Sequence, residues 1–527
     1  MSSKLRSLAG LAALAFALSA PAAERANVVV TAGGAVKGTE RDGVLAFLGV
    51  PYAKPPVGPL RWRSPEPAVP WSGERDATRF APSCYQPPPV AFGPYTGEFL
   101  DTPAPSEDCL YLNVWAPSSG ARDLPVLVWI HGGGFTGGSG ALDIYNGSRL
   151  AAKGAVVVTI NYRLGPFGFL ALPALSAESG AGSGTYGLQD IIAALRWVRR
   201  SIAAFGGDPD KVTVAGQSAG AIAVNELLLA PSARGLFARA IAESGSGMGV
   251  GAPRLADAER TGERLLAAAG AADLAALRAL PADKILTAAP AFAPKLDGKG
   301  PPAPTFIPVQ DGAILPDTPD HAATAAVAPV PLMTGYNADE ARRPGQPESP
   351  ADFEDYVRGR YGAMAERFLA LYPHRTAAEA ADSMEVIARD RSMASLVIFA
   401  EQRSGASGQP VYAYLFTHPV PVAQPPGWGT FHTGEVPYLF DMLDTSRRPY
   451  GAEDDRIADQ ISAYWLGFMR TGVPGGDGMA PWPAVRSGTG EVMMLGDRVA
   501  SQAAVSSAAR LQAFRDFVAG GETLSLF

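Results

Sequence analysis

The chain has 527 residues, of which 47% are hydrophobic and 18% are charged, a balance typical of a globular protein and not of a disordered one. Its 44 basic and 51 acidic residues give a net charge of −7, which argues against a nucleic-acid partner, because such a partner needs a basic surface. The length allows one large α/β domain or several units. Since neither an internal repeat nor a low-complexity linker divides the chain, we expect a single domain over residues 23–527.

The first residues have the composition of a secretory signal peptide, which we predict over residues 1–22. Lys4 and Arg6 supply a basic start, residues 8–18 are mostly apolar, and Ala20-Pro21-Ala22 offers a cleavage site. A buried N-terminal helix is the alternative. No later stretch is apolar for the roughly 18 residues that a membrane span needs. The sequence therefore predicts a secreted or periplasmic protein with no membrane span after signal removal.

The cysteines and histidines indicate whether the chain forms a disulfide and whether it binds a metal. In an exported protein, a lone pair at the spacing of Cys84 and Cys109 favours a disulfide over two free thiols. The five histidines are scattered and form no cluster with the spacing of metal ligands. We therefore expect neither a metal nor another cofactor.

Short alternating strands are predicted at residues 27–30 and 44–47, followed by a proline-rich, irregular stretch at 51–105 that could rim a pocket. Two further strands are predicted at residues 110–115 and 124–130. The second of them is almost continuously apolar, as is typical of a strand covered on both faces.

A glycine triplet follows that apolar strand directly, in His131-Gly132-Gly133-Gly134-Phe135. Glycines let successive amides converge on one point, and upstream of a nucleophile they can form a two-part oxyanion hole. A flexible loop is one alternative. A phosphate-binding loop is another, but no Lys-Ser or Lys-Thr pair follows the glycines.

Residues 211–229 combine a buried strand, a serine between glycines and a helix. Gly216-Gln217-Ser218-Ala219-Gly220 has the Gly-x-Ser-x-Gly spacing of a nucleophile elbow. The turn is tight, so that a Cβ at either glycine would clash. The amide of Ala219 would lie at the helix N-terminus and point toward whatever Ser218 attacks. A serine that caps an ordinary helix is the alternative. The helix is predicted to bury one face, made by Ile222, Val224 and Leu227–Leu229.

The rest of the chain alternates between strands and helices. Strands are predicted at residues 155–161, 239–244, 330–335, 411–416 and 491–495, and helical patterns at 188–205, 350–371, 377–403, 457–469 and 507–518. Strand, helix and strand in this order imply parallel pairing. The sequence thus predicts the α/β class, with a large, mostly parallel central sheet and helices on both faces.

A serine in an elbow needs a histidine to take its proton and a carboxylate to hold that histidine. The chain order in this architecture is nucleophile, acid, histidine, which excludes His131 because it precedes the serine. Spacing favours His432, in a glycine-rich loop, over His418, which lies between a strand and a proline. Asp339 and Glu340 both follow a predicted strand. The pattern does not separate these two carboxylates, and a solvated surface carboxylate is the alternative for either.

With these parts identified, the sequence resembles the type B carboxylesterases, the family of the cholinesterases and the bacterial para-nitrobenzyl esterases. The resemblance covers nearly all of the mature chain. It is carried, in order, by Gly49-Val50-Pro51-Tyr52-Ala53-Lys54-Pro55-Pro56-Val57-Gly58-Pro59-Leu60-Arg61-Trp62, Glu107-Asp108-Cys109-Leu110-Tyr111-Leu112-Asn113-Val114-Trp115, the glycine triplet, Gly206-Gly207-Asp208-Pro209, the elbow, Asp339-Glu340 and Phe431-His432. It implies an α/β-hydrolase fold with a small N-terminal antiparallel sheet.

The resemblance also implies roles for individual residues. Matched by motif, Ser218 is similar to the family's nucleophile, His432 to its general base and Glu340 to its acid. Gly133, Gly134 and Ala219 match the residues whose amides form the family's oxyanion hole. Cys84 and Cys109 match its first disulfide, and Ser244 matches a serine near the catalytic histidine.

The sequence departs from the family pattern at three places. Gln217 stands where many relatives have a glutamate, which puts in doubt an auxiliary role that needs negative charge. The proline-rich stretch at 86–105 gives no clear match to the aromatic choline-binding site, so cholinesterase activity is not expected. Ala341 replaces the usual glycine after the acid and is followed by Arg342 and Arg343.

The sequence therefore predicts an exported serine carboxylesterase that hydrolyses a small-molecule carboxylic ester through an acyl-enzyme. One alternative is an esterase for polycarboxylate esters of the fumonisin type (tricarballylic esters), in which Arg342 and Arg343 would bind an anionic acyl group. Solvated arginines on a loop are the other interpretation of that pair. An alternative of another class is a non-catalytic, cholinesterase-like binding protein.

Overall fold

The computed structural model describes residues 27–249, 251–290, 292–293, 303–318, 327–340, 349–422 and 427–524. The predicted signal segment and the Ala341-Arg342-Arg343 stretch lie outside the described residues. Within the described ranges, no helix is long and apolar enough to cross a membrane.

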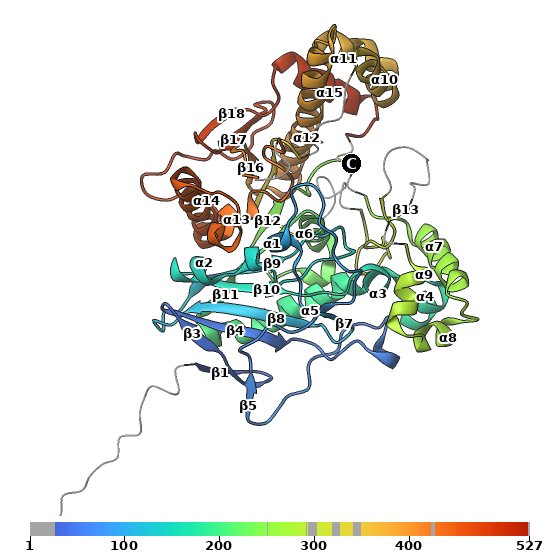
Figure 1. Ribbon diagram of the computed structural model, residues 1–527, viewed down its shortest axis with the longest axis vertical. Helices are drawn as coiled ribbons and strands as arrows, with labels where there is room; N and C mark the ends of the chain where they lie inside the picture. Colours follow the sequence, from blue (N-terminus) through green and yellow to red (C-terminus); the bar gives the residue numbers. More distant parts are fainter. Residues whose placement is uncertain are drawn as a thin grey trace, which may run out of the picture.

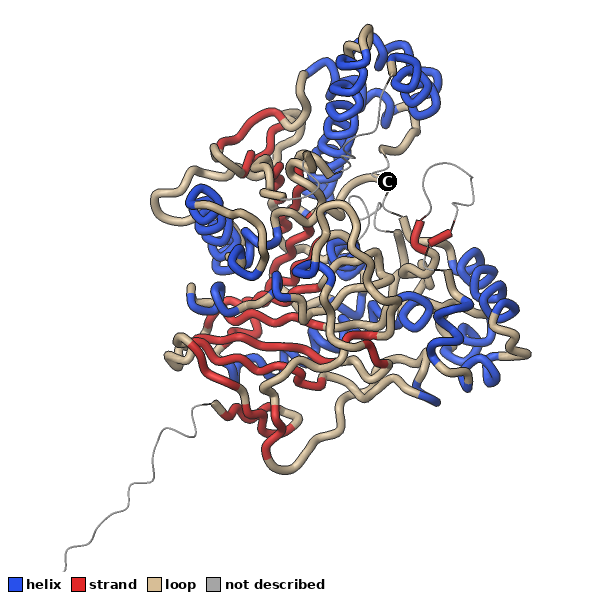
Figure 2. The backbone as a smooth tube through the Cα atoms, viewed as in Figure 1, coloured by secondary structure: helices blue, strands red, loops and turns tan. Residues whose placement is uncertain are grey.

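A large sheet runs through the molecule, with strands drawn in red in Figure 2. In the described part of the chain it has 11 strands, in the order β18-β17-β16-β15-β12-β11-β9-β10-β8-β4-β3. The strands from β17 to β10 pair in parallel, and the pairs at both edges are antiparallel. The bounds are β3 Thr39–Arg41, β4 Val44–Pro51, β8 Tyr111–Pro117, β9 Leu124–Ile130, β10 Val156–Ile160, β11 Gly207–Gln217, β12 Arg239–Glu243, β15 Leu332–Asn337, β16 Val411–Phe416, β17 Glu491–Leu495 and β18 Ala500–Ala503.

The remaining strands form small sheets. Beside the large sheet, at the N-terminus, β2 pairs antiparallel with β1 and parallel with β5. Two short two-stranded pairs, β6 with β7 and β13 with β14, lie in the connections. Their bounds are β1 Val28–Thr31, β2 Gly34–Lys37, β5 Glu74–Asp76, β6 Ser83–Cys84, β7 Pro105–Ser106, β13 Phe292–Ala293 and β14 Ala303–Pro304.

Both faces of the large sheet are covered by apolar cores, as the apolar run of β9 predicts. Leu127 and Trp129 belong to the core on one face, and the alternate residues Val126, Val128 and Ile130 belong to the core on the other. Because side chains alternate along a strand, a strand buried on both sides needs apolar residues at every position.

The helices divide between these two cores. Helices α2, α13 and α14 supply the core that contains Trp129, and α5, α6 and α12 supply the other. In Figure 1 the group α10, α11, α12 and α15 lies at the top of the view, and α7, α8 and α9 form a second group at the lower right. The bounds are α1 Gly97–Leu100, α2 Ser148–Ala152, α3 Gly165–Phe169, α4 Pro173–Ser179, α5 Tyr186–Ser201, α6 Ala219–Leu229, α7 Leu255–Ala268, α8 Leu274–Ala279, α9 Ala282–Ala288, α10 Pro350–Tyr361, α11 Ala365–Leu371, α12 Ala377–Ser407, α13 Val436–Phe440, α14 Ala452–Thr471 and α15 Ala508–Ala519.

Two helix predictions need correction. Ile222 is the one α6 residue that is not buried, because this helix is packed around almost its whole circumference instead of along one face. The helical pattern at 350–371 is broken into α10 and α11 by a 3-10 turn at Gly362–Met364, where Gly362 adopts a φ of 49° that a glycine takes without steric cost.

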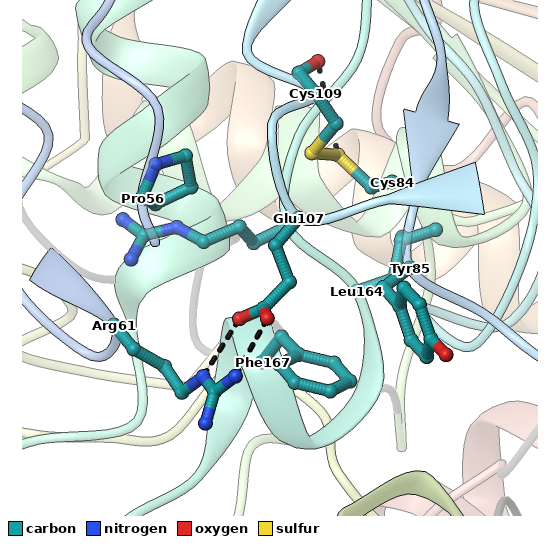
Figure 3. A pocket seen from close by; sticks show the side chains of 9 residues that line it. Pro56, Arg61, Cys84, Tyr85, Glu107, Cys109, Leu164 and Phe167 are labelled. Atoms are coloured by element: carbon teal, nitrogen blue, oxygen red, sulfur yellow. Dashed lines mark hydrogen bonds and ion pairs between the residues drawn. A yellow bond between two sulfur atoms is a disulfide. The ribbon is translucent and has the colours of Figure 1, made fainter. Parts of the chain in front are cut away.

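The loop before β8 is held by a disulfide between Cys84 and Cys109, the pairing that the resemblance implies. Figure 3 shows it beside a small pocket, in which Arg61 donates two hydrogen bonds to Glu107, at 2.7 and 2.6 Å. The pocket has a volume of about 10 Å³, which is room for about one water molecule. We therefore assign it to the structural support of the loop and not to a substrate.

Candidate active site

Ser218 lies at the tip of a sharp turn between β11 and α6. Its φ of 56° and ψ of −123° are a strained backbone conformation for a residue with a side chain. A Cβ at Gly220 would lie 2.1 Å from the carbonyl oxygen of Ile130, and a Cβ at Gly216 would lie 2.6 Å from the backbone of Gly220. These are the strand, turn and helix that the sequence predicts, and both glycines are required by the contacts.

The glycine triplet lies against this turn. A Cβ at Gly132 would lie 2.8 Å from the carbonyl oxygen of Gln217 and 3.1 Å from the Cβ of Ser218. Gly133 and Gly134 adopt φ values of 106° and 62°, and their amides donate no hydrogen bond to any residue that the structure describes. The amide of Ala219 begins α6 and therefore has no partner within the helix. Three amides, two in the glycine loop and one at the start of α6, are thus free to donate to an oxygen atom.

His432 lies in the loop between β16 and α13. Its Nδ1 makes a short hydrogen bond to Oε2 of Glu340, and the Tyr95 hydroxyl donates to its carbonyl oxygen at 2.8 Å. The other ring nitrogen, Nε2, lies 3.2 Å from the side-chain nitrogen of Gln217, the residue before Ser218. The structure therefore brings the predicted base to the elbow. In the described part of the chain, the hydroxyl of Ser218 makes no hydrogen bond to the ring of His432.

The geometry separates the two carboxylates that the pattern left open. Glu340 faces the histidine, and its Oε1 accepts hydrogen bonds from the Asn337 amide at 2.9 Å and from the Ser244 hydroxyl. Asp339 instead accepts from the backbone amide of Thr430 at 2.9 Å and pairs with Arg389 at 3.1 Å. Asp339 thus holds the loop that carries the histidine, and only Glu340 holds the imidazole itself.

Electrostatics favours a charged imidazole at this position. Burial opposes the charge of His432, but the carboxylate of Glu340 outweighs that cost and, with a smaller contribution from Glu435, raises the pKa of the ring above its usual value. A base that takes the proton of a serine becomes an imidazolium. A carboxylate beside it stabilises this charged form.

Glu435 is a feature of the site that the sequence reasoning missed. It is 2% exposed, its Oε2 accepts a hydrogen bond from the side chain of Asn337, and its Oε1 has no partner among the described residues. Burial and the charge of Glu340 raise its pKa to about 7. A carboxylate three residues after His432 in an apolar segment was the signal that could have pointed to it.

Two other histidines are engaged elsewhere. His131 is buried and stacks on Tyr162, and burial lowers its pKa to about 4 despite a hydrogen bond with the Gly132 carbonyl. His418 contacts Asp454 at 3.0 Å and Asp497 at 2.6 Å. Over the described ranges, no group of three or more His, Cys, Asp or Glu side chains could hold a metal ion.

A family model described as "Carboxylesterase family" matches residues 25–514. The chain is 37% identical to the fumonisin B1 esterase of Sphingopyxis macrogoltabida, over 89% of this chain and 86% of that protein. It is 38% identical to the para-nitrobenzyl esterase of Bacillus subtilis, over 90% of this chain and 95% of that protein.

Solved structures give the same result. A structure titled PNB esterase superposes with a TM-score of 0.78 at 35% identity, covering 93% of this chain and 99% of that one. The resemblance stated from the motifs is therefore confirmed, and so is the α/β-hydrolase fold with its large mixed sheet and small N-terminal sheet.

Proposed function

Because this protein belongs to the carboxylesterase family and is a carboxylic ester hydrolase, we propose that Ser218 is its nucleophile, His432 its general base and Glu340 the acid that holds the base. The observation that carries this proposal is the hydrogen bond from His432 to Glu340, made while the same ring lies against the residue next to Ser218. Nucleophile, base and carboxylate are the three parts that such a reaction needs.

The reaction then proceeds in two halves. Ser218 Oγ attacks the carbonyl carbon of the ester, His432 Nε2 takes the hydroxyl proton, and the alcohol leaves with that proton. A water molecule, deprotonated by the same nitrogen, attacks the acyl-enzyme and releases the acid. Glu340 keeps the proton on Nδ1 and stabilises the imidazolium in both halves.

The negative oxygen that forms in each half would be bound by the amides of Gly133, Gly134 and Ala219. Each such donor contributes on the order of 3 kcal/mol to the rate, because it is fixed before the charge develops. This assignment is supported by the amides of Gly133 and Gly134, which have no hydrogen-bond partner among the described residues, and by the contact of the preceding residue, Gly132, with the elbow at Ser218.

Two finer points accompany the proposal. Export is supported by the disulfide between Cys84 and Cys109, since such bonds persist in oxidising compartments.

A polycarboxylate ester is a second candidate substrate, supported by the similarity to a fumonisin B1 esterase. Arg342→Ala and Arg343→Ala should then lower turnover of carboxylated esters and leave neutral esters unchanged, and an unchanged preference would end that candidate.

Hydrolysis of short-chain para-nitrophenyl esters tests the nucleophile. Ser218→Ala should lower kcat by on the order of 10⁶-fold, as the loss of a catalytic serine does elsewhere. The melting temperature of the variant should match that of the wild type, because the hydroxyl makes no hydrogen bond to His432 in the structure. Comparable activity in a folded Ser218→Ala variant would reject the assignment.

A further inference from the structure

We propose that His131 and Thr136 are positioning residues of the oxyanion hole, each of which holds, through a backbone carbonyl, the orientation of one amide that binds the negative oxygen. This role rests on the proposed function, in which the amides of Gly133 and Gly134 are oxyanion donors. It gives a task to the histidine that the chain order excludes as the general base.

A peptide unit couples the carbonyl of one residue to the amide of the next. The unit is planar and trans, so its C=O and its N–H point in opposite directions. A hydrogen bond that holds the carbonyl therefore also fixes the direction of the amide. The coupling matters in this loop because glycines turn with little steric resistance, and Gly133 and Gly134 adopt φ values of 106° and 62°.

The carbonyl in the same peptide unit as the Gly133 amide belongs to Gly132, and His131 holds it. Nδ1 of His131 lies 2.8 Å from this oxygen. A carbonyl oxygen only accepts, so Nδ1 carries the proton and donates it. Burial lowers the pKa of His131 to about 4, so the ring is neutral at neutral pH and its single proton is used in this bond. Among the described residues, no other group donates to the Gly132 carbonyl.

The ring of His131 is itself held in place. It is 1% exposed and stacks on Tyr162 with the ring centroids 4.5 Å apart, and the Tyr162 hydroxyl donates to the His131 carbonyl oxygen at 2.9 Å. A Cβ at Gly138 would lie 2.5 Å from Nδ1 and 2.7 Å from the Gly132 carbonyl oxygen, so the far end of the loop packs directly against this hydrogen bond. The donor therefore has little freedom to move away from the carbonyl.

The carbonyl in the same peptide unit as the Gly134 amide belongs to Gly133 and has three donors. The amides of Thr136 and Gly137 donate to it at 3.0 and 3.1 Å, and the Thr136 hydroxyl donates at 3.0 Å. Thr136 thus supplies the one side-chain donor of three, whereas His131 supplies the one donor that the described residues offer to its carbonyl. Loss of the histidine donor should therefore disturb the oxyanion hole more than loss of the threonine hydroxyl.

Two amide substitutions of His131 test the position of its donor. Asparagine places a side-chain N–H near the position of Nδ1 and glutamine places one near Nε2, while both remove the ring that stacks on Tyr162. His131→Asn should keep kcat for para-nitrophenyl acetate within about threefold of the wild type. His131→Gln should lower it roughly 10- to 100-fold, approaching the cost of losing one oxyanion donor. A role in packing alone would affect the two variants equally.

Thr136→Val and Thr136→Ser form a second pair. Valine keeps the shape of threonine without the donor, and serine keeps the hydroxyl. Because two backbone amides remain on the Gly133 carbonyl, Thr136→Val should lower kcat by only about three- to tenfold, and Thr136→Ser should match the wild type. The side chain is half-buried, so this pair makes little demand on the packing of the core.

Inhibition by a trifluoromethyl ketone provides a readout that a merely structural role would not move. Ser218 Oγ adds to its carbonyl carbon, the serine proton passes to His432, and the carbonyl oxygen becomes the anion that the amides bind. In each variant the inhibition constant should rise by the factor by which kcat/KM falls. Inhibition by the methyl ketone of the same chain length, which binds uncharged, should stay unchanged. Melting temperatures give the folded state of every variant.

Equal losses of kcat in His131→Asn and His131→Gln would overturn the role of His131, and an unchanged kcat in Thr136→Val would overturn that of Thr136. Should the His131 variants not fold, the Thr136 pair still decides whether a held carbonyl orients its amide. A loss of kcat without a matching loss of affinity for the trifluoromethyl ketone would overturn both roles. Failure of the proposed function is a separate result, because the ketone would then inhibit the wild type and an active Ser218→Ala variant equally.

Discussion

At the scale of single residues, the site is defined by which of two neighbouring carboxylates reaches the imidazole. Asp339 and Glu340 follow the same strand, and their chemistry is nearly the same. Glu340 accepts from His432, Ser244 and the Asn337 amide, whereas Asp339 is used by the backbone of Thr430 and by Arg389. Their roles in the proposed reaction differ because of these partners alone.

A matched pair of variants tests this difference. Glu340→Gln should lower kcat by on the order of 10⁴-fold, because an amide no longer requires the proton on Nδ1 and cannot stabilise the imidazolium. Asp339→Asn removes the negative charge at the neighbouring position and leaves the carboxylate of Glu340, which contacts the imidazole, unchanged. Its main effect should be a loss of stability of about 1–3 kcal/mol, seen as a lower denaturation midpoint. Equal losses of kcat in the two variants would contradict the assignment.

At the scale of elements, the elbow depends on backbones that nearly touch. α6 crosses the end of β9 so closely that Gly220 has no room for a methyl group, since the Ile130 carbonyl oxygen would lie 2.1 Å away. The same close approach places the Ala219 amide beside the glycine loop. The packing of α6 and the orientation of the Ala219 amide, which we propose as an oxyanion donor, therefore depend on the same close contact.

Gly220→Ala should accordingly lower both the free energy of unfolding and kcat. The free energy of unfolding should fall by at least the roughly 1–3 kcal/mol that is usual for overpacking. Gly359→Ala in α10 is the control, because a Cβ there meets nothing within 4 Å and alanine should stabilise the helix by about 0.5–1 kcal/mol. Thermal unfolding and ester hydrolysis of both variants provide the measurement. A stable, active Gly220→Ala variant would show that the close approach is not required.

At the scale of the whole molecule, the sequence predicts best what local pattern determines. The bounds of β9 and β16 agree with their apolar runs, because a strand buried on both faces has no polar positions to blur its ends. The elbow and the glycine loop were equally visible, since their glycines are required by local backbone geometry.

What the sequence could not reveal depends on packing between distant segments. The partial exposure of Ile222 follows from helices and strands that surround α6 on its other sides. The burial of Glu435 and its hydrogen bond to Asn337 join residues that lie on different elements. The contact from Gln217 to His432 spans 215 positions of the chain, and no local pattern encodes such a pairing.

The site as a whole is assembled from segments along most of the chain, from Tyr95 to Glu435, so it exists only in the folded protein. Its central claim is that Ser218, activated by His432, is the nucleophile. Labelling with a fluorophosphonate, read by intact-mass and peptide mass spectrometry, tests this most directly. The account predicts one label per chain, located on Ser218 and absent in Ser218→Ala. Ester hydrolysis that persists while Ser218 stays unlabelled, or a label on another residue, would contradict it.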